Sequence, residues 1–147
     1  MSGPDGPSPF VFLPFRMRSG RIPVPVMQLA YCRSVEDFVA AAAPLGRALA
    51  LLHGDPAHPW TVEALGRRVG LSRSGLGQRF TALIGVPPMQ YLARWRTSLA
   101  AQRLRETDAP IIRVANDVGY DSEAAFNRAF KREFGLPPAA WRKSQAR

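Results

Sequence analysis

Hydrophobic residues recur every three or four positions through most of the chain beyond its N-terminal segment, which is the spacing of a buried helix face. Leu45, Leu49 and Leu52 follow this spacing and predict an amphipathic helix. A shorter helix is expected before it, over about residues 35–43, because acidic residues occupy its first turn. Pro44 is predicted to end or bend that first helix, since proline lacks the N–H that an interior helical position needs.

The N-terminal segment has a different composition. Six of the fourteen prolines lie in the first 25 residues, interleaved with glycine and serine, and this composition opposes helix formation. We therefore predict residues 1–32 to be irregular. Two apolar pieces, residues 10–15 and 22–31, either form short edge strands or wrap the domain without regular structure, and their prolines favour the second alternative. Residues 1–43 are accordingly assigned to an extension, and residues 44–147 to the main domain.

A segment of about thirty residues occurs twice in the rest of the chain, with the copies about fifty residues apart. The offset between the copies is 49 residues up to a shared glycine and 50 residues beyond it, so the second copy has one extra residue at that point. The matching positions are Thr61 and Pro110, Leu65 and Val114, Val69 and Val118, Gly70 and Gly119, Ser72 and Ser122, Leu76 and Phe126, Phe80 and Phe130, and Tyr91 and Trp141. Such a repeat indicates one structural unit built twice.

Each copy has the pattern of a helix-turn-helix unit. A short amphipathic helix reaches a glycine suited to a left-handed exit, a hydrophobic residue follows, and a serine caps the next helix. We expect the first unit over about residues 61–85 and the second over about 110–135. The stripes predicted to be buried by the second helices are Leu76, Phe80 and Leu83 in the first copy and Phe126, Phe130 and Phe134 in the second. The opposite face of each of these helices is left for solvent or a partner.

A long helix is predicted between the copies, over about residues 87–106, with Leu92, Trp95 and Leu99 along one face. About 18 helical residues make a rod of about 27 Å, comparable with the ~34 Å of one turn of DNA. Two readers on one rod could therefore enter neighbouring major grooves without a second chain. The expected fold class is all-α, with about seven helices and two homeodomain-like helix-turn-helix units joined by this linker helix.

Basic residues concentrate in the same region as the repeat. The chain has 20 Lys and Arg against 11 Asp and Glu, a net charge of +9 and a pI near 11.2. Residues 57–147 hold 15 of the bases but only seven of the acids. This balance indicates a polyanionic partner, either nucleic acid or an acidic membrane surface.

Other classes of protein fit the sequence poorly. No apolar run is long enough to span a membrane and the N-terminus lacks a secretion signal, so neither spanning nor export is expected. The lone cysteine, Cys32, cannot form an internal disulfide, and a reducing cytoplasmic setting is expected. His53 and His58 have no partner set for a metal or a reaction and are interpreted as helix caps. No enzymatic activity, cofactor or metal is therefore predicted.

The region from about Leu45 to Trp141 resembles the double helix-turn-helix DNA-binding domain of the AraC/XylS transcription regulators. The residues that carry the resemblance are VANDVGYDSEAAFNRAFKREFGLPPAAWR, residues 114–142, and TVEALGRRVGLSRSGLGQRFTALIGVPPMQYLARWR, residues 61–96. The resemblance implies sequence-specific binding of duplex DNA and bacterial transcription control, more often activation than repression. RNA polymerase is then a second partner, contacted or excluded at the promoter. No membrane partner is expected, and the chain is expected to act as a monomer or weak dimer.

Two departures from the family accompany the resemblance. Members usually carry a separate sensor and dimerisation domain before the DNA-binding part, and the first 56 residues here are too few and too rich in proline to build one. The chain is thus either a stand-alone reader or part of a longer regulator, and no small-molecule sensor domain is evident. Second, Gly75 and Gly77 lie in the first recognition helix, where each costs about 1 kcal/mol of helix propensity. Glycine there either weakens the helix and its base readout or lets the backbone approach a phosphate or a thymine methyl.

Base contacts are predicted from the outward faces of the two recognition helices. Gln78 can pair with both edge atoms of adenine, and the guanidinium fork of Arg128 fits guanine. Glu123 could accept from cytosine or pair within the chain with Arg128. The candidate base contacts are Arg73, Ser74, Gln78, Glu123, Asn127 and Arg128. The alternative for each residue is a solvated surface position.

Other basic side chains are assigned to phosphate contacts or to internal pairing with Glu133 and Asp117. The candidate phosphate contacts are Arg79, Arg96, Lys131, Arg132 and Arg142. Such contacts set affinity and its salt dependence without conveying sequence. Two rival functions stay open: a nonspecific architectural nucleic-acid binder, and an interaction module in which residues 10–15 and the stripe at Leu45 bind a partner protein.

Overall fold

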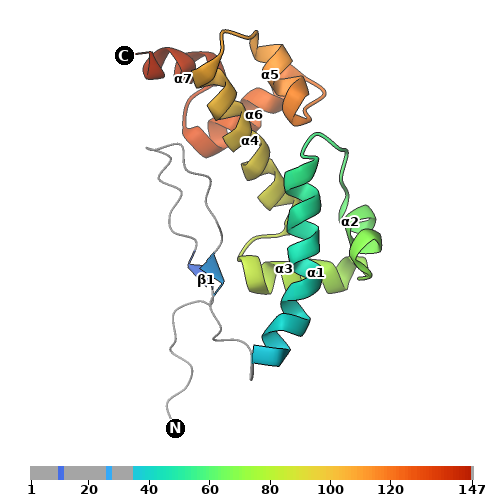
Figure 1. Cartoon of the computed structure of the whole chain (residues 1–147). Coiled ribbons are helices and arrows are strands. Elements are labelled where there is room, and N and C mark those ends of the chain that lie inside the picture. Colours follow the sequence, from blue (N-terminus) through green and yellow to red (C-terminus); the bar gives the residue numbers. More distant parts are fainter. Residues whose placement is uncertain (1–9, 12–25, 28–34, 147) are drawn as a thin grey trace. The chain divides into compact units, whose positions relative to one another are not determined.

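The structure is a computed structural model that describes the backbone of residues 10–11, 26–27 and 35–146 and the side chains of residues 42–146. Within those residues it has seven helices, shown in chain order in Figure 1. They are α1 (Val35–Gly54), α2 (Val62–Val69), α3 (Arg73–Ile84), α4 (Pro88–Glu106), α5 (Ile111–Val118), α6 (Glu123–Phe134) and α7 (Pro138–Gln145). The predicted all-α class, with two helix-turn-helix units and a long helix between them, is confirmed.

Two very short strands occur in the N-terminal segment. β1 (Phe10–Val11) pairs with β2 (Val26–Met27) in an antiparallel register, with Phe10 opposite Met27 and Val11 opposite Val26. Each strand lies inside one of the two apolar pieces for which short strands were one of the alternatives. The remainder of those pieces, and the predictions made for it, lie outside the described residues.

α1 is one continuous helix, whereas two helices separated or bent at Pro44 were predicted. It runs through Pro44 without a break, although proline in a helix interior removes a backbone hydrogen bond and costs about 3 kcal/mol or more. Leu45, Ala48 and Leu52 in its C-terminal half are buried at 1% exposure or less. The burial of these apolar side chains offsets the loss. The alternative in which Pro44 ends the first helix is therefore wrong.

The described helices fall into two compact units. Unit 1 comprises Met1–Leu51 and Trp60–Met89, and unit 2 comprises Leu52–Pro59 and Gln90–Arg147. Each unit therefore holds one helix-turn-helix pair, α2 with α3 in unit 1 and α5 with α6 in unit 2. α1 and α4 contribute residues to both units.

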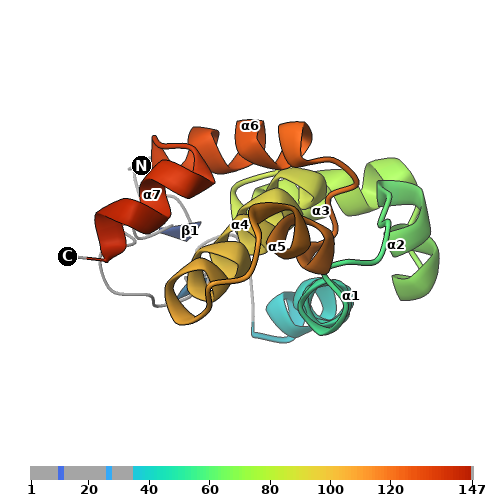
Figure 2. The ribbon, with the colours of Figure 1, turned by 90° about the horizontal axis from the view of Figure 1, so that it is seen from above.

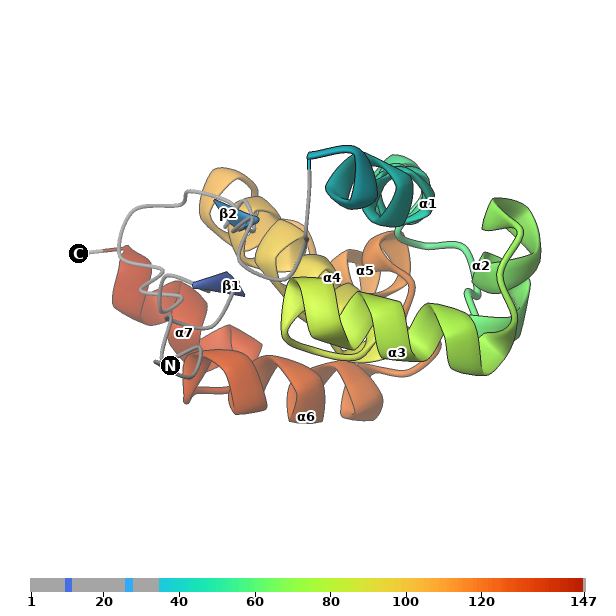
Figure 3. The same cartoon turned by 90° about the horizontal axis from the view of Figure 1, so that it is seen from below.

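In unit 1, α2 packs against α3, which Figure 3 shows along its length with α2 at its N-terminal end. The stripe predicted for the second helix of the first copy is buried as expected. The buried apolar side chains of unit 1 are Leu45, Ala48, Trp60, Leu65, Val69, Leu76, Phe80, Leu83 and Ile84. Because α3 buries only this stripe, its polar face stays uncovered within the unit.

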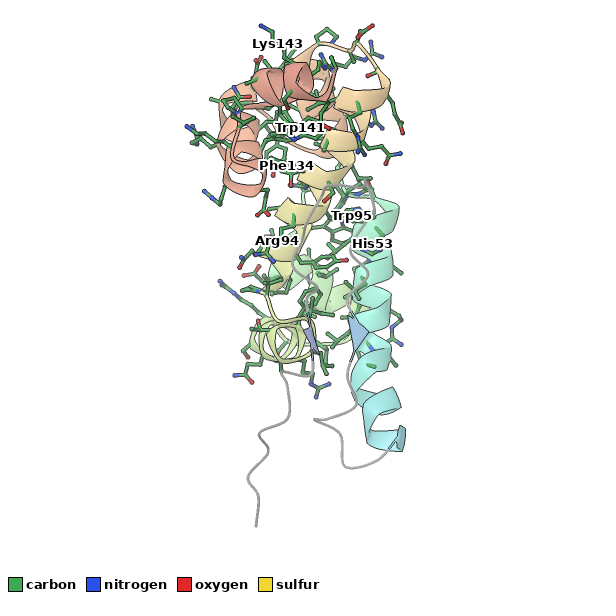
Figure 4. The ribbon with its side chains drawn as sticks, turned by 90° about the vertical axis from the view of Figure 1, so that its left-hand side faces the viewer. His53, Arg94, Trp95, Phe134, Trp141 and Lys143 are labelled. Atoms are coloured by element: carbon green, nitrogen blue, oxygen red, sulfur yellow. The ribbon has the colours of Figure 1, made fainter. Side chains whose placement is uncertain are left out.

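In unit 2, α6 packs against α5 and α7 (Figure 2). The core of this unit is aromatic. Phe126 and Phe130 are fully buried with their ring centroids 5.6 Å apart, and Phe134 stacks on Phe130 at 4.3 Å. Trp141 of α7 meets Phe134 edge-on at 5.4 Å, as the labelled side chains show (Figure 4). The predicted stripe of α6 is thus buried at its first two positions and half-buried at Phe134.

The linker helix α4 starts one residue after its predicted start and ends at the predicted residue. Of its predicted apolar face, Leu92 is buried, whereas Trp95 and Leu99 are half-buried. Among the helices of the described part, none is both long and apolar enough to cross a membrane.

Candidate nucleic-acid interface

The second helix of each unit begins at a serine cap. The Oγ atoms of Ser72 and Ser122 each accept a 3.1 Å hydrogen bond from the backbone N–H three residues later. The helix before each cap ends at a glycine with a left-handed backbone, with φ at 76° in Gly70 and 107° in Gly119. A residue with a side chain rarely adopts these angles. The repeat predicts both the serine caps and the left-handed glycines. Together they set the direction in which α3 and α6 leave their turns.

The second turn is one residue longer than the first. The residue of the preceding helix that packs against the turn also differs, with glycine in unit 1 and alanine in unit 2. In unit 1 the Leu71 N–H donates to the Gly66 carbonyl at 2.8 Å, and a Cβ at position 66 would lie 2.5 Å from the Leu71 carbonyl oxygen. In unit 2 the Tyr120 N–H donates to the Ala115 carbonyl at 2.9 Å, and Ala115 has its own methyl group at the matching place. The extra residue of the second turn therefore accommodates a side chain that the first turn excludes.

The outward face of α3 carries the first set of predicted base contacts. Arg73, Ser74 and Gln78 are all exposed, and so is the predicted phosphate contact Arg79. The Arg73 Nη1 atom lies 2.9 Å from Glu63 Oε1 of α2, although 73% of the Arg73 side chain is exposed. An ion pair this exposed contributes little to stability, but it restrains where the guanidinium lies.

No role was predicted for Glu63, which the structure places in the first turn of α2. That place is a signal for a favourable interaction with the helix dipole. The pairing with Arg73 depends instead on how α2 and α3 cross, and no local pattern in the sequence encodes that crossing.

The outward face of α6 carries the second set. Glu123, Arg128, Lys131 and Arg132 are exposed, and Asn127 is half-buried. Within residues 42–146 neither Glu123 nor Arg128 forms an ion pair, so the alternative in which these two residues pair is not observed. The face therefore presents three basic groups with no acidic partner among the described side chains.

Arg96, predicted to contact phosphate, is instead engaged inside unit 2. Its Nε donates to the Pro56 carbonyl at 2.7 Å and its Nη2 to the His58 carbonyl at 2.9 Å. Its Cζ lies 5.7 Å from the centroid of the Tyr120 ring. Burial lowers the pKa of Arg96, while Tyr120 and Asp121 oppose that shift. The guanidinium thus ties the loop after α1 to α4.

Arg142 has the same kind of environment at the other end of unit 2. It is half-buried, its Nε donates to the Leu104 carbonyl at 3.2 Å, and its Nη2 donates to the Ala109 carbonyl at 2.7 Å. These bonds tie α7 to the end of α4 and to the loop that follows. Both arginines therefore serve the scaffold, where a charged donor satisfies loop carbonyls and, at Leu104, a carbonyl in the last turn of α4.

The acidic partners proposed for the internal arginines pair with other residues. Glu133 Oε1 lies 3.6 Å from the Nε of Arg94, and Asp117 Oδ2 lies 2.7 Å from the Nη1 of Arg103. The expected pairing of Glu133 and Asp117 with the candidate phosphate contacts is therefore wrong. Arg94 and Arg103 both belong to α4.

His53 does not cap α1, because it lies inside the last turn of that helix. Its Nε2 is 2.6 Å from the Tyr91 hydroxyl, and its ring stacks on Trp95 with the centroids 4.1 Å apart (Figure 4). Burial lowers the pKa of His53 and raises the pKa of Tyr91 to about 12. His58 lies 3.9 Å from Asp55. No cluster of three metal-ligating side chains occurs in the described part of the chain.

Known proteins share this arrangement of motifs. A family model described as a helix-turn-helix domain matches residues 65–144. An AraC-like transcription regulator of Streptomyces antibioticus is 50% identical over 96 residues, which are 65% of this chain and 32% of the relative. The transcriptional activator RclR of Escherichia coli strain K12 is 39% identical over 88 residues, which are 60% of this chain and 31% of the relative. The chain thus matches about a third of the length of these curated relatives.

A solved structure extends the similarity to three dimensions. It is a crystal structure of the DNA-binding domain of AdpA, a global transcriptional factor, in complex with a target DNA. It is similar to 69% of this chain and to 91% of its own chain, with a TM-score of 0.66 and 32% sequence identity.

Proposed function

Because this chain belongs to the AraC-type helix-turn-helix family of transcription regulators, we propose that it binds duplex DNA sequence-specifically, with α3 and α6 in two adjacent major-groove segments. The observation that carries the proposal is repeated in both units: a capped second helix buries one apolar stripe and leaves the opposite polar face uncovered. The relatives are transcription regulators and not enzymes, so the activity is binding.

In the proposed complex α6 is the principal reader. Arg128 is exposed and has no ion-pair partner among residues 42–146, so its guanidinium is available to the two acceptors of guanine. Asn127, next to it, offers the donor and acceptor pair that adenine requires. Glu123 in the first turn accepts from the amino group of cytosine.

The contribution of α3 rests on smaller side chains. Gln78 lies at the place in the first unit that Arg128 has in the second, and its amide suits adenine. Ser74 can bond to any base edge. Glu63 competes with DNA for Arg73, which makes Arg73 the weaker of the arginines proposed to read bases.

The proposed phosphate contacts are the exposed residues Arg79, Lys131 and Arg132. Their charges set affinity and its salt dependence but not the choice of sequence. Arg96 and Arg142 are omitted from this set because the Nε and Nη2 atoms of each already donate to backbone carbonyls.

We propose that α4 acts as the strut between the two readers. Its 19 residues make about 28 Å at ~1.5 Å per residue, close to the ~34 Å turn of B-form DNA. One chain then spans two major-groove segments, so the proposed binding unit is a monomer or weak dimer.

The proposed outcome of binding is activation of transcription through contact with RNA polymerase. The support for activation is the description of the relative RclR as a transcriptional activator.

Selection of bound duplexes from a random pool tests the proposal. We expect a recurrent sequence, and an affinity for it at least ~10³ times that for a scrambled duplex at the same salt concentration. A ratio near one at every salt concentration would contradict sequence-specific binding and favour a nonspecific architectural binder. Both affinities are measured at the same salt concentration, because the contribution of phosphate contacts to affinity changes steeply with salt.

A further inference from the structure

Gly77 lies at the edge of the outward face of α3 and is half-buried. Its neighbours on the helix surface lie three and four positions away on either side. Among them Arg73, Ser74 and Thr81 are exposed, whereas Phe80 is buried. Gly77 therefore borders the surface that the proposed function places in the major groove.

The fold of unit 1 does not require glycine at this position. A Cβ added to Gly77 would meet no heavy atom within 4 Å, and its φ is not among the positive values recorded for the described glycines. Gly66 is the opposite case, because a Cβ there would lie 2.5 Å from the Leu71 carbonyl oxygen. Packing thus explains Gly66 and leaves Gly77 unexplained.

The repeat shows that the unit tolerates a side chain at this place. The residue of α6 that corresponds to Gly77, fifty positions later, is Asn127. Glycine is also among the poorest helix formers, so its presence in α3 weakens the helix without a compensating contact in the free protein. A residue that breaks a local rule without a structural reason points to a function.

We propose that Gly77 is a specificity-determining residue, at which the bare backbone of α3 rests against the C5-methyl group of a thymine in the major groove. This inference rests on the proposed function. A methyl group is the one apolar feature that base edges present in that groove, and the CH2 of a glycine offers it an apolar surface. The corresponding residue of α6, Asn127, is among the proposed base contacts, which favours a base edge over a phosphate for Gly77.

The competing explanation makes the opposite prediction. If Gly77 only loosens α3, then alanine would order the helix before binding and tighten the complex. If the backbone touches a thymine, the alanine methyl would hold α3 away from the base and weaken the complex. The sign of the change in affinity therefore separates the two explanations.

The first experiment compares Gly77→Ala with the matched control Gly46→Ala in the full chain. Gly46 is an exposed position of α1, and a Cβ there also meets no heavy atom within 4 Å. Both variants should raise the thermal midpoint by about 2 to 6 °C, since both replace a helical glycine. Gly77→Ala should bind the selected duplex about tenfold more weakly, whereas Gly46→Ala should bind as the wild type does. Binding by Gly77→Ala that equals or exceeds the wild type would overturn the proposal.

The second experiment removes the methyl group from the DNA instead. Each thymine of the selected duplex is replaced in turn by uracil, and the affinity of the wild type and of Gly77→Ala is measured for each duplex. We expect one position at which uracil weakens the wild type several-fold and has little effect on Gly77→Ala. Equal losses for both proteins at every position would overturn the thymine assignment.

The outcomes distinguish a failure of the proposed function from a failure of the role of Gly77. A wild type without preference for any selected duplex would overturn both the proposed function and the role of Gly77. A preference in the wild type that Gly77→Ala keeps in full would overturn only the role of Gly77.

Discussion

α3 and α6 have the same place in two copies of one unit, yet their compositions differ. α3 contains Gly75 and Gly77 and has no acidic residue in its first turn. α6 opens with Glu123 followed by two alanines, which favour the helix by dipole interaction and by propensity. α6 is therefore the better-formed helix by its own sequence, and α3 depends more on the packing of Leu76 and Phe80 against α2.

Within residues 42–146, the outward face of α6 also carries more unpaired positive charge than that of α3. α6 presents Arg128, Lys131 and Arg132 without acidic partners among the described side chains, whereas α3 presents Arg79 and an Arg73 that is paired with Glu63. One scaffold thus presents two faces of different charge and side-chain size. On this basis we expect α6 to supply most of the side-chain contacts to DNA and α3 to supply a closer backbone fit.

The largest expected effect is on the turn of unit 1. Gly66→Ala should lower the free energy of unfolding by about 3 kcal/mol, because the new methyl group collides with a backbone oxygen that cannot rotate away. Urea denaturation measures this loss. Ala115→Gly at the matching place in unit 2 should cost only about 1 kcal/mol, from helix propensity.

An insertion checks the reason for that asymmetry. Adding one residue between Leu71 and Ser72 gives the first turn the length of the second, and it should recover part of the stability lost in Gly66→Ala. If Gly66→Ala alone is as stable as the wild type, the first turn does not exclude a side chain at position 66.

The next effect concerns base reading by α6. Arg128→Ala should cost about 2 kcal/mol of binding to the selected duplex and should relax the preference at one base pair. Lys131→Ala serves as the control, because loss of a phosphate contact should weaken every duplex alike and reduce the salt slope by about 1. Competition assays over several salt concentrations measure both. An equal loss on all sequences for Arg128→Ala would show that it does not read a base.

A smaller effect distinguishes arginines bonded inside the protein from those proposed to contact phosphate. Arg96→Gln should lower the free energy of unfolding by about 1 to 2 kcal/mol, since two carbonyls lose a charged donor, and should leave the salt slope of binding unchanged. Arg132→Gln should leave the free energy of unfolding unchanged and reduce the salt slope of binding. A reduced salt slope with full stability in Arg96→Gln would return that residue to the phosphate contacts.

The smallest effect is expected at the ion pair of unit 1. Glu63→Gln should change stability by less than ~1 kcal/mol, because the pair is exposed, and should raise the affinity for DNA about two- to threefold by releasing Arg73. The same substitution in an Arg73→Ala background should have no such effect on affinity. A gain that persists without Arg73 would attribute the change to the loss of a negative charge alone.

Much of the fold follows from short-range patterns. The caps at Ser72 and Ser122 and the left-handed glycines at Gly70 and Gly119 are predicted from the repeat and observed in the structure. Each depends on a few neighbouring residues, which is why the sequence reveals it. The outward positions of α3 and α6 follow as well, because the periodicity of the buried stripe leaves only one opposite face.

Contacts between distant segments were not predictable in the same way. The continuity of α1 through Pro44 depends on the burial of its C-terminal half, which outweighs a strong local preference against proline. The partners of Glu63, Arg96 and Arg142 depend on which backbone or side-chain groups the fold brings within reach.

The sequence by itself thus determined the two helix-turn-helix units, their caps and the residues that face outward, because these follow from helical periodicity and from the conformations that glycine and serine favour. Only the tertiary structure decided which arginines remain available to a partner and which are used inside the protein. The physical reason is that a guanidinium finds its partner through space, and every exposed arginine looks alike in a sequence until the surrounding carbonyls and carboxylates have been placed.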